Sequence, residues 1–512
     1  WLLRKHNEKL LDGIDFRITP LVWLFVFLSV VAVIISMSVV LKSTDALNSG
    51  TQEQITTGNI NRPNIVLVSM DALTALDMQL YGYRRPTTPF ISEWSKDALV
   101  FNKFYAASNW TTPAAMSMMT GQRPWTHKVW YRAFFNPVSK YEKNLPSVLK
   151  NNGYGVYNFI QNPYANPHTL GMEDSFDMKN RAYSFGVQAD MWYELFENMP
   201  VVGDWVSSLP LINMLTALSF PNNVTTTLTP PELIYNRFLD YISEREQTEN
   251  NKQPFFAWLH VLSPHKWYLP PKPYMGLFGD ADRFNKNTDQ LIDHEYPPEK
   301  QADIDILRKR YDEFILYSDK QFEIFLQHLS EKIDMTNTII ILSADHGESF
   351  SHGYFEHAGQ HLYEPLVHIP LVIKMLDRKA GKRIDVPVEQ IDLAPTILEL
   401  AGIDAPGWME GRSLLPLTDG RTFEQRPVFS MQLNKNPSFG QPIQKGTVAL
   451  WEADYKLIYY LGKKEVLLFN LKDDPGESTN LKDEKPDVTQ RLLDVIKKNI
   501  SQANKRITQS QD

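Results

Sequence analysis

Two acids and a histidine directly follow apolar runs, in a pattern that suits a metal ion. Asp71 follows the apolar run at 64–70, and Asp345-His346 follows the run at 338–344. Two carboxylates and an imidazole are typical ligands of a divalent ion such as Zn²⁺ or Mn²⁺. A lone aspartate at a strand end is also a common cap or turn residue. The combination of all three residues therefore carries the prediction of a shared metal ion.

A threonine lies where a helix is expected to begin. Pro113 suits the first turn of a helix, the small and apolar residues after it suit its body, and Gly121 suits its end. Thr111 then lies at or before the helix N-terminus, where free N–H groups and the helix dipole favour an anion. A nearby metal would make its hydroxyl a nucleophile without a neighbouring base. Taken alone, the segment also fits an ordinary capping threonine.

Histidines gather in two further segments. His260 ends the apolar run at 255–260 and His265 lies five positions later. His352, His357 and His361 follow His346, so four of the 12 histidines fall between positions 346 and 361. An imidazole can donate to a phosphoryl or sulfuryl oxygen, or protonate a leaving group. The clustering favours a metal or anion site over scattered surface positions. A loop histidine held by backbone hydrogen bonds is the alternative for His265.

The elements expected around these residues predict an α/β fold with a doubly wound, mostly parallel sheet. Buried strands are predicted at 64–70, 255–260, 338–344 and 371–374. Apolar residues at helical spacing between Leu307 and Leu329 predict a helix between two of the strands. Ligands bind such sheets beyond the carboxyl ends of the strands, which is where Asp71 and Asp345 lie.

The sequence pattern changes at about residue 425 and predicts a small C-terminal α+β subdomain. The segments Val448 to Tyr460 and Glu465 to Leu471 are expected to pair as strands, and a tail helix is expected from Asp487 to Ser501. The segment 183–232 is rich in Trp, Phe, Met, Leu and Pro and matches no pattern. It could face lipid or form ordinary core.

An uncharged apolar run from Leu21 to Leu41 predicts a transmembrane helix, since a bilayer core needs about 20 apolar residues. A signal peptide is the alternative, but its apolar core usually spans roughly 7 to 15 residues. The cations before the run are Arg4, Lys5, Lys9 and Arg17, and those after it, up to position 62, are Lys42 and Arg62. This bias predicts a cytoplasmic N-terminus and an extracytoplasmic main domain, periplasmic or extracellular.

Composition excludes several classes of function. The net charge of −8 argues against a general nucleic-acid-binding surface. The chain has no cysteine, which excludes disulfides, thiolate metal sites and a cysteine nucleophile. Its 512 residues suffice for a large α/β domain with a smaller appendage.

The order of the motifs resembles sulfatase-like members of the alkaline-phosphatase superfamily over roughly residues 63–482. The N-terminal motifs are 64–71, Leu80-Tyr-Gly-Tyr83, Pro86-Thr-Thr-Pro89 and 111–121. The later motifs are Pro254-Phe-Phe, His260, Pro264-His265, Ser343-Ala-Asp-His-Gly-Glu348, Leu362-Tyr-Glu364, Ile369-Pro-Leu371, Ile391-Asp-Leu-Ala-Pro-Thr396, Gly411-Arg-Ser-Leu414, Lys456-Leu-Ile458, Asp474-Pro-Gly-Glu477 and Asn480-Leu481. The resemblance implies that Asp71, Asp345 and His346 bind the metal. It also implies that Thr111 is the nucleophile and a metal ligand, and that His265 holds the substrate anion.

Three positions depart from the sulfatase pattern. True sulfatases oxidise a Cys or Ser in a Cys/Ser-x-Pro-x-Arg motif to an aldehyde hydrate, whereas Thr111 cannot form that aldehyde. The arginine position of the motif is Ala115, and the second family acid is Ala72. A threonine with Asp-His is similar to the phosphotransferase and phosphodiesterase branch, which includes membrane enzymes that transfer phospholipid head groups. No complete second ligand set can be mapped, which favours a single ion, Mn, Zn or Ca.

Three hypotheses of function follow. In the first, a membrane-anchored enzyme acts on phosphoesters, possible donors being membrane lipids, through a covalent threonine intermediate. Thr111 and His265 are its catalytic residues, and His260, His357 and His361 bind substrate. The second is a sulfatase-like hydrolase of sulfated glycans. The third is a catalytically silent relative that binds lipid or a protein partner.

The same reasoning divides the chain into five parts. These are a cytoplasmic juxtamembrane segment (1–20), a transmembrane helix (21–41), a linker (42–62), a sulfatase-like catalytic domain (63–424) and a C-terminal subdomain with a tail helix (425–512).

Overall fold

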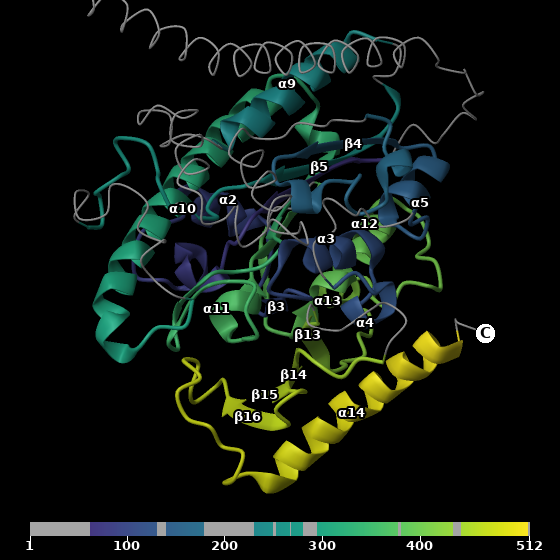
Figure 1. The fold of residues 1–512 in the computed structure, drawn as a ribbon. Coiled ribbons are helices and arrows are strands. Elements are labelled where there is room, and N and C mark those ends of the chain that lie inside the picture. The colour runs from purple at the N-terminus through teal and green to yellow at the C-terminus, as the bar shows by residue number, and fades with distance from the viewer. Residues whose placement is uncertain are drawn as a thin grey trace, which may run out of the picture. The chain divides into compact units, whose positions relative to one another are not determined.

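The computed structural model describes residues 62–130, 140–178, 230–248, 252–266, 268–279, 294–376, 380–433 and 442–509 (Figure 1). The predicted transmembrane helix at 21–41 and nearly all of the segment 183–232 lie outside these ranges. Among the helices of the described ranges, none is long and apolar enough to cross a membrane. The membrane anchor and the extracytoplasmic location therefore stay predictions.

A seven-stranded sheet forms the centre of the molecule, with the strand order β11-β2-β10-β6-β1-β5-β4. The bounds are β1 Asn64–Met70, β2 Leu99–Phe101, β4 Gly155–Ile160, β5 Phe255–Val261, β6 Thr338–Ala344, β10 Leu371–Lys374 and β11 Lys382–Ile384. Strands β4, β5, β1 and β6 run parallel, whereas β10 is antiparallel to both β6 and β2. The expected α/β fold is confirmed, and its sheet is mixed.

Helices cover the sheet in two groups. One group is α2 (Pro89–Trp94), α9 (Glu232–Glu246) and α10 (Gln301–Ser330), and the other is α3 (Thr111–Thr120), α5 (Leu145–Asn151) and α12 (Leu393–Leu400). In the first group α10 contacts both α2 and α9, and in the second group all three helices contact one another. Figure 1 shows the groups on either side of the sheet. Strands β1, β5 and β6 are buried almost throughout, as expected for strands covered on both faces.

Several smaller elements surround this core. They are the short helices α4 (Pro124–His127), α11 (Glu364–Val367) and α13 (Pro416–Asp419), the three-stranded sheet of β12 (Val388–Glu389), β3 (Phe104–Tyr105) and β9 (His368–Ile369), and the hairpin of β7 (Ser349–Ser351) with β8 (Tyr354–Glu356). The hairpin follows the Asp345-His346 segment directly, so it belongs to the surroundings of the candidate site.

The C-terminal part is a four-stranded antiparallel sheet packed against a long helix. Its elements are β13 (Val428–Gln432), β14 (Thr447–Glu452), β15 (Tyr455–Tyr460), β16 (Glu465–Asn470) and α14 (Pro486–Gln509). The segment 448–460, expected as one strand, is a hairpin of two strands, because Ala453 adopts a left-handed conformation (φ 53°) and reverses the chain. Helix α14 extends beyond the expected end, since Ala503 and Ile507 are also buried against the sheet.

Candidate metal centre and active site

The two candidate acids leave the same edge of the sheet. Strands β1 and β6 are adjacent and parallel, and their register pairs Met70 with Ala344. Asp71 and Asp345, the next residues of each strand, therefore emerge side by side. Asp71, Asp345 and His346 are all buried, and each offers a ligand atom within 4.8 Å of those of the other two. The structure thus brings together the three residues that the sequence predicts as metal ligands.

The unpaired atoms of this group fit a cation. Asp71 Oδ1 and Asp345 Oδ2 are buried without a hydrogen-bond partner, and each lies 3.6 Å from His346 Nε2. His346 Nδ1 donates to the carbonyl oxygen of Gly347 at 2.9 Å, so Nε2 is the ring nitrogen that faces the two acids. Buried carboxylate oxygens without partners are costly. Two such oxygens and an imidazole nitrogen form a donor set for a divalent ion.

The threonine hydroxyl borders the same space. Helix α3 begins at Thr111, and its end is set by Gly121 in the left-handed conformation (φ 63°). Thr111 Oγ1 lies 3.2 Å from His346 Nε2 and 3.5 Å from Asn162 Nδ2. A hydroxyl at the first turn of a helix is close to free backbone N–H groups that favour a bound anion. The arrangement can hold a tetrahedral oxyanion beside the metal group and attack it.

The pKa values of the two carboxylates in the metal group shift in opposite directions. Burial disfavours the ionised form of Asp71, but the imidazoles of His265, His260 and His346 outweigh it and lower its pKa. Burial and the neighbouring charge of Asp71 instead raise the pKa of Asp345. One carboxylate is therefore ionised at the expense of the other, a conflict that a divalent cation between them would relieve.

An asparagine that sequence reasoning missed completes the centre. Asn162 follows strand β4, and its Nδ2 donates to Asp71 Oδ2 at 2.5 Å as well as approaching Thr111. Like His346, it contacts both Asp71 and Thr111, and it does so from the end of the edge strand β4. The only sequence signal for it is weak: the short segment Val156 to Ile160, which Asn158 interrupts, is followed by the polar pair Gln161-Asn162.

His260 lies behind the metal group. It is fully buried, with Nε2 3.3 Å from Asp71 Oδ2 and Nδ1 2.8 Å from Ser69 Oγ. Burial opposes a charge on this ring, but the hydrogen bond to Asp71 and the charge of Asp345 outweigh it and raise its pKa. These contacts suit a residue that positions Asp71, whereas the sequence pattern predicts a residue that binds substrate directly.

The structure brings His265 and His357 to the centre and leaves His352 and His361 apart. The His357 ring lies 4.4 Å from that of His346 and 4.8 Å from that of His265, measured between centroids. His357 Nδ1 is 2.9 Å from Glu348 Oε1, and His265 Nδ1 donates to the carbonyl of Lys266 at 2.7 Å. His361 instead contacts Tyr460 through Nδ1, at 3.1 Å, and none of its described contacts reaches the metal group.

Comparisons with known proteins identify the family of the chain. The family model named Sulfatase matches residues 63–403, and the model for the C-terminal region of N-sulphoglucosamine sulphohydrolase matches residues 350–506. An arylsulfatase of Clostridium perfringens (strain 13 / Type A) is 25% identical over 451 residues, covering 82% of this chain and 90% of that protein.

Solved structures share the fold at low identity. A phosphonate monoester hydrolase from Silicibacter pomeroyi has a TM-score of 0.64 and 18% identity, covering 86% of this chain and 96% of its own. A protein solved with its substrate D-glucosamine-2-N,6-O-disulfate has a TM-score of 0.63 and 17% identity, covering 86% and 98%. Since the Sulfatase model spans most of the described core and the fold agrees, the chain belongs to the sulfatase family of the alkaline-phosphatase superfamily.

Proposed function

We propose that the chain is a metal-dependent ester hydrolase in which Thr111 attacks the sulfur or phosphorus of a sulfate or phosphorus ester. The observation that carries this proposal is the position of Thr111 Oγ1, 3.2 Å from His346 Nε2, beside two buried carboxylate oxygens without partners. Asp71, Asp345, His346 and Thr111 would hold the ion. When bound, the ion supplies Lewis-acid stabilisation of the hydroxyl and of the ester oxygens.

The chain's own groups account for the steps of the reaction. The Thr111 hydroxyl loses its proton, its Oγ bonds to the central atom of the ester, and the bond from that atom to the leaving oxygen breaks. The leaving oxygen gains a proton. Water then attacks the same central atom, releases the anion and restores the hydroxyl. His265 and His357 lie at the centre and would carry these protons, while Asn162 and His260 hold Asp71 in place.

Sulfated sugars are the substrate class that the comparisons favour. The C-terminal match to N-sulphoglucosamine sulphohydrolase and the likeness to the structure with a disulfated glucosamine both support this second of the sequence hypotheses. Nothing in the described part of the chain supports the phospholipid substrate or the lipid partner of the first hypothesis.

Phosphorus esters are the second candidate, and a specific observation favours them. The attacking position holds Thr111, which cannot form the aldehyde on which sulfatase chemistry depends, whereas an alkoxide suits transfer through a covalent phospho-threonine. The fold likeness to a phosphonate monoester hydrolase is compatible with the same chemistry. The third hypothesis, a catalytically silent binding protein, is distinguished by metal content, because such a protein would need no stoichiometric divalent ion.

A substrate panel with matched variants tests the proposal. The purified chain is loaded with Mn²⁺, Zn²⁺ or Ca²⁺ and assayed on aryl sulfate, sulfated glucosamine, a phosphodiester and a phosphonate monoester. We expect activity with one ion, loss on chelation and recovery on adding the ion back. Thr111→Ala should abolish turnover, by at least about 10³-fold, with unchanged unfolding behaviour. Thr111→Ser keeps the hydroxyl and should keep measurable activity.

Two outcomes would contradict the mechanism. Full turnover by the Thr111→Ala variant would show that Thr111 is not the nucleophile. If the purified protein held no divalent ion and its activity were unchanged by a chelator, the metal dependence of the mechanism would be contradicted. Mass spectrometry after a rapid quench provides a separate readout, because the covalent intermediate adds a sulfo or phospho group to Thr111.

A further inference from the structure

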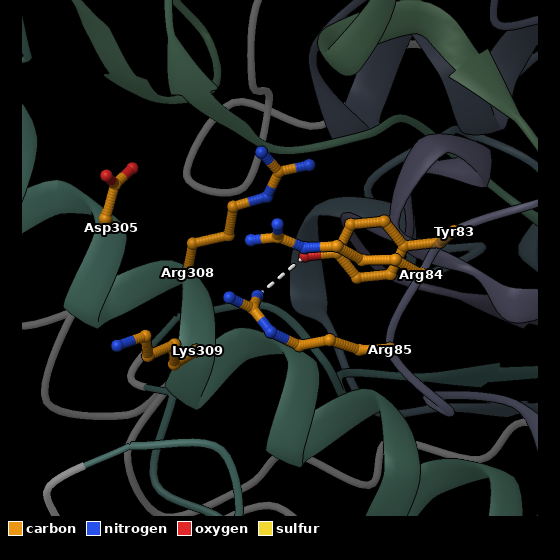
Figure 2. A pocket seen from close by; sticks show the side chains of 6 residues that line it. All are labelled: Tyr83, Arg84, Arg85, Asp305, Arg308 and Lys309. Carbon is orange, nitrogen blue, oxygen red and sulfur yellow. Dashed lines mark hydrogen bonds between the residues drawn. The ribbon is translucent and has the colours of Figure 1, made fainter.

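A charged cavity lies beside the segment 83–85, and none of its lining residues belongs to the metal group. Its volume is about 360 Å³, and its lining residues are Tyr83, Arg84, Arg85, Asp305, Arg308 and Lys309. The Arg85 guanidinium lies 5.8 Å from the centre of the Tyr83 ring, and Figure 2 shows the Asp305 carboxylate standing apart from the guanidinium groups on α10. The lining therefore carries four cations and a single acid.

Two of the cations are fixed by buried acids beneath the cavity. Arg85 forms an ion pair with Asp312, and Arg308 forms one with Asp77. Tyr83 braces the first pair, because its hydroxyl donates to Asp312 Oδ2 at 2.8 Å and accepts from Arg85 at 2.7 Å. The Arg308 guanidinium lies 5.2 Å from the centre of the Tyr83 ring. These guanidinium groups are thus held in place before any ligand arrives.

The other two cations have no such acid. Among the described residues, neither Arg84 nor Lys309 has a hydrogen-bond or ion-pair partner. Asp305 accepts a hydrogen bond from Gln301 at 2.9 Å, within the first turn of α10. The charges of Arg308 and Arg85 are balanced by Asp77 and Asp312. Of the remaining lining residues, Arg84 and Lys309 are cations and Asp305 is an acid, which leaves a net charge of one positive unit. Burial and the neighbouring Asp77 also raise the pKa of Asp312, to about 8, which weakens its compensation of Arg85.

We propose that this cavity binds a sulfate or phosphate group at a site separate from the metal centre. Pre-positioned guanidinium groups offer paired N–H donors that match a tetrahedral oxyanion, and Arg84 and Lys309 supply the uncompensated charge. The volume lies in the range of small-molecule sites and leaves room for a sugar ring that carries the anion. Clustered cations are ordinarily explained as a solvated protein surface. Such a surface does not require guanidinium groups that are anchored on buried acids, as Arg85 and Arg308 are.

Binding at the cavity is independent of the proposed reaction. The cavity and the metal centre share the loop after β1, and Tyr311, one turn beyond Arg308 on α10, donates to the carbonyl of Ala72 at 2.6 Å. The residues of the cavity are not among those that we place in the catalytic machinery. Binding at the cavity can therefore be present or absent whatever the outcome at Thr111.

Hydrogen exchange of the full-length, metal-loaded protein tests the site. Inorganic sulfate and inorganic phosphate are the first probes. We expect both to protect backbone amides around 83–85 and 305–309, at concentrations that also give a binding isotherm by calorimetry. The double variant Arg84→Gln/Lys309→Gln should lose this protection and bind at least about tenfold more weakly. Its turnover of a small monoester should equal that of the wild type.

A matched control removes two cations elsewhere. Lys472→Gln/Lys485→Gln changes two exposed lysines of the C-terminal part by the same charge and should leave protection unchanged. Wild-type protein without protection in these segments at saturating sulfate and phosphate would overturn the proposal. Protection that survives in Arg84→Gln/Lys309→Gln, or that falls equally in the control pair, would overturn it as well.

A sulfated monosaccharide and its unsulfated form identify the source of the anion. Tighter binding of the sulfated sugar than of free sulfate would indicate a group carried on a carbohydrate, and tighter binding of the free ion would indicate an inorganic ligand. Either result supports the site. Protection by the unsulfated sugar alone would contradict it, because the cavity would then recognise the ring.

Discussion

At the scale of single residues, the centre depends on a neighbour that is not a predicted ligand. Asn162 joins Asp71 and Thr111, so Asn162→Ala should free both side chains to move. Residues that orient metal ligands typically contribute about 10- to 100-fold to metal affinity or activity. We expect a loss of that size in kcat/KM and in the affinity for the divalent ion, measured by metal titration.

The control for this variant is Asn152→Ala, an exposed asparagine that follows α5 and lies outside the centre. It should retain full activity and metal affinity. Asn162→Ala with wild-type kcat/KM would show that the contact with Asp71 is incidental.

Sequence reasoning located the metal group because its residue types are distinctive and their strand ends are simple to recognise. Asp71 and Asp345 follow long apolar runs, and parallel neighbours bring such ends to one edge. Asn162 carries no comparable signal, since asparagine in a loop is common and its role depends on which strand lies beside β5. The position of His361 against Tyr460 likewise depends on tertiary packing that no local pattern encodes.

At the scale of elements, the segment after β6 must pass close to α11. A Cβ at Gly347 would lie 2.1 Å from the carbonyl oxygen of Pro365 and 3.1 Å from Thr74 Cβ. Gly347→Ala should therefore push His346 away from Asp71, with a loss of about 1–3 kcal/mol in the free energy of unfolding. Urea denaturation and metal titration measure the two effects.

Gly407→Ala is the matched control, because a Cβ there meets nothing within 4 Å. Its stability and metal affinity should be those of the wild type. Equal behaviour of the two alanine variants would show that the close approach at Gly347 places no constraint on the centre.

A buried acid on α10 holds α2 and makes stability depend on pH. Asp319 accepts the backbone N–H groups of Phe90 and Ile91 at 2.9 and 2.8 Å. Burial raises the pKa of Asp319 from 3.8 to about 7, although the two N–H groups lower it. The folded protein thus holds this proton more tightly than the unfolded chain. The contribution of Asp319 to stability is largest below pH 3.8, falls as pH rises and levels off above about pH 7.

Asp319→Asn should remove this dependence. Relative to wild type, the variant should gain stability as pH rises between about 4 and 7, by at most about 1.4 kcal/mol per pH unit. Denaturant unfolding at several pH values measures the slope. Asp483→Asn, at an exposed position, should follow the wild-type curve. Parallel curves for Asp319→Asn and wild type would contradict the assignment.

Element prediction succeeded where a run was long enough to show a pattern. Strands β1, β5 and β6 and helix α10 fall on predicted segments, whereas β2 and β11 contain three residues each and show no periodicity. The antiparallel direction of β10 could not be predicted, because an apolar run of four residues has no direction of its own. The hairpin at 453–454 was missed because neither of its turn residues is a glycine or proline.

At the scale of the whole molecule, a buried ion network joins the C-terminal sheet to the catalytic part. Lys456 on β15 is fully buried, 3.0 Å from Glu364 Oε1 on α11 and 2.7 Å from Glu477 Oε1. Trp451 donates to the same Glu364 oxygen at 2.9 Å. Because α11 also contacts the segment of Gly347, the network connects the C-terminal part to the metal centre through a single short helix.

Removing the cation of this network should therefore affect the whole molecule. Lys456→Ala leaves two buried carboxylates without their shared partner, which typically costs about 3–5 kcal/mol. We expect a loss of that size in the free energy of unfolding, measured by urea denaturation. Lys472→Ala, at an exposed position of the same subdomain, should change it by less than about 0.5 kcal/mol. A Lys456→Ala protein as stable as Lys472→Ala would mean that the two acids are protonated and need no cation, so that apolar contacts alone hold the C-terminal sheet in place.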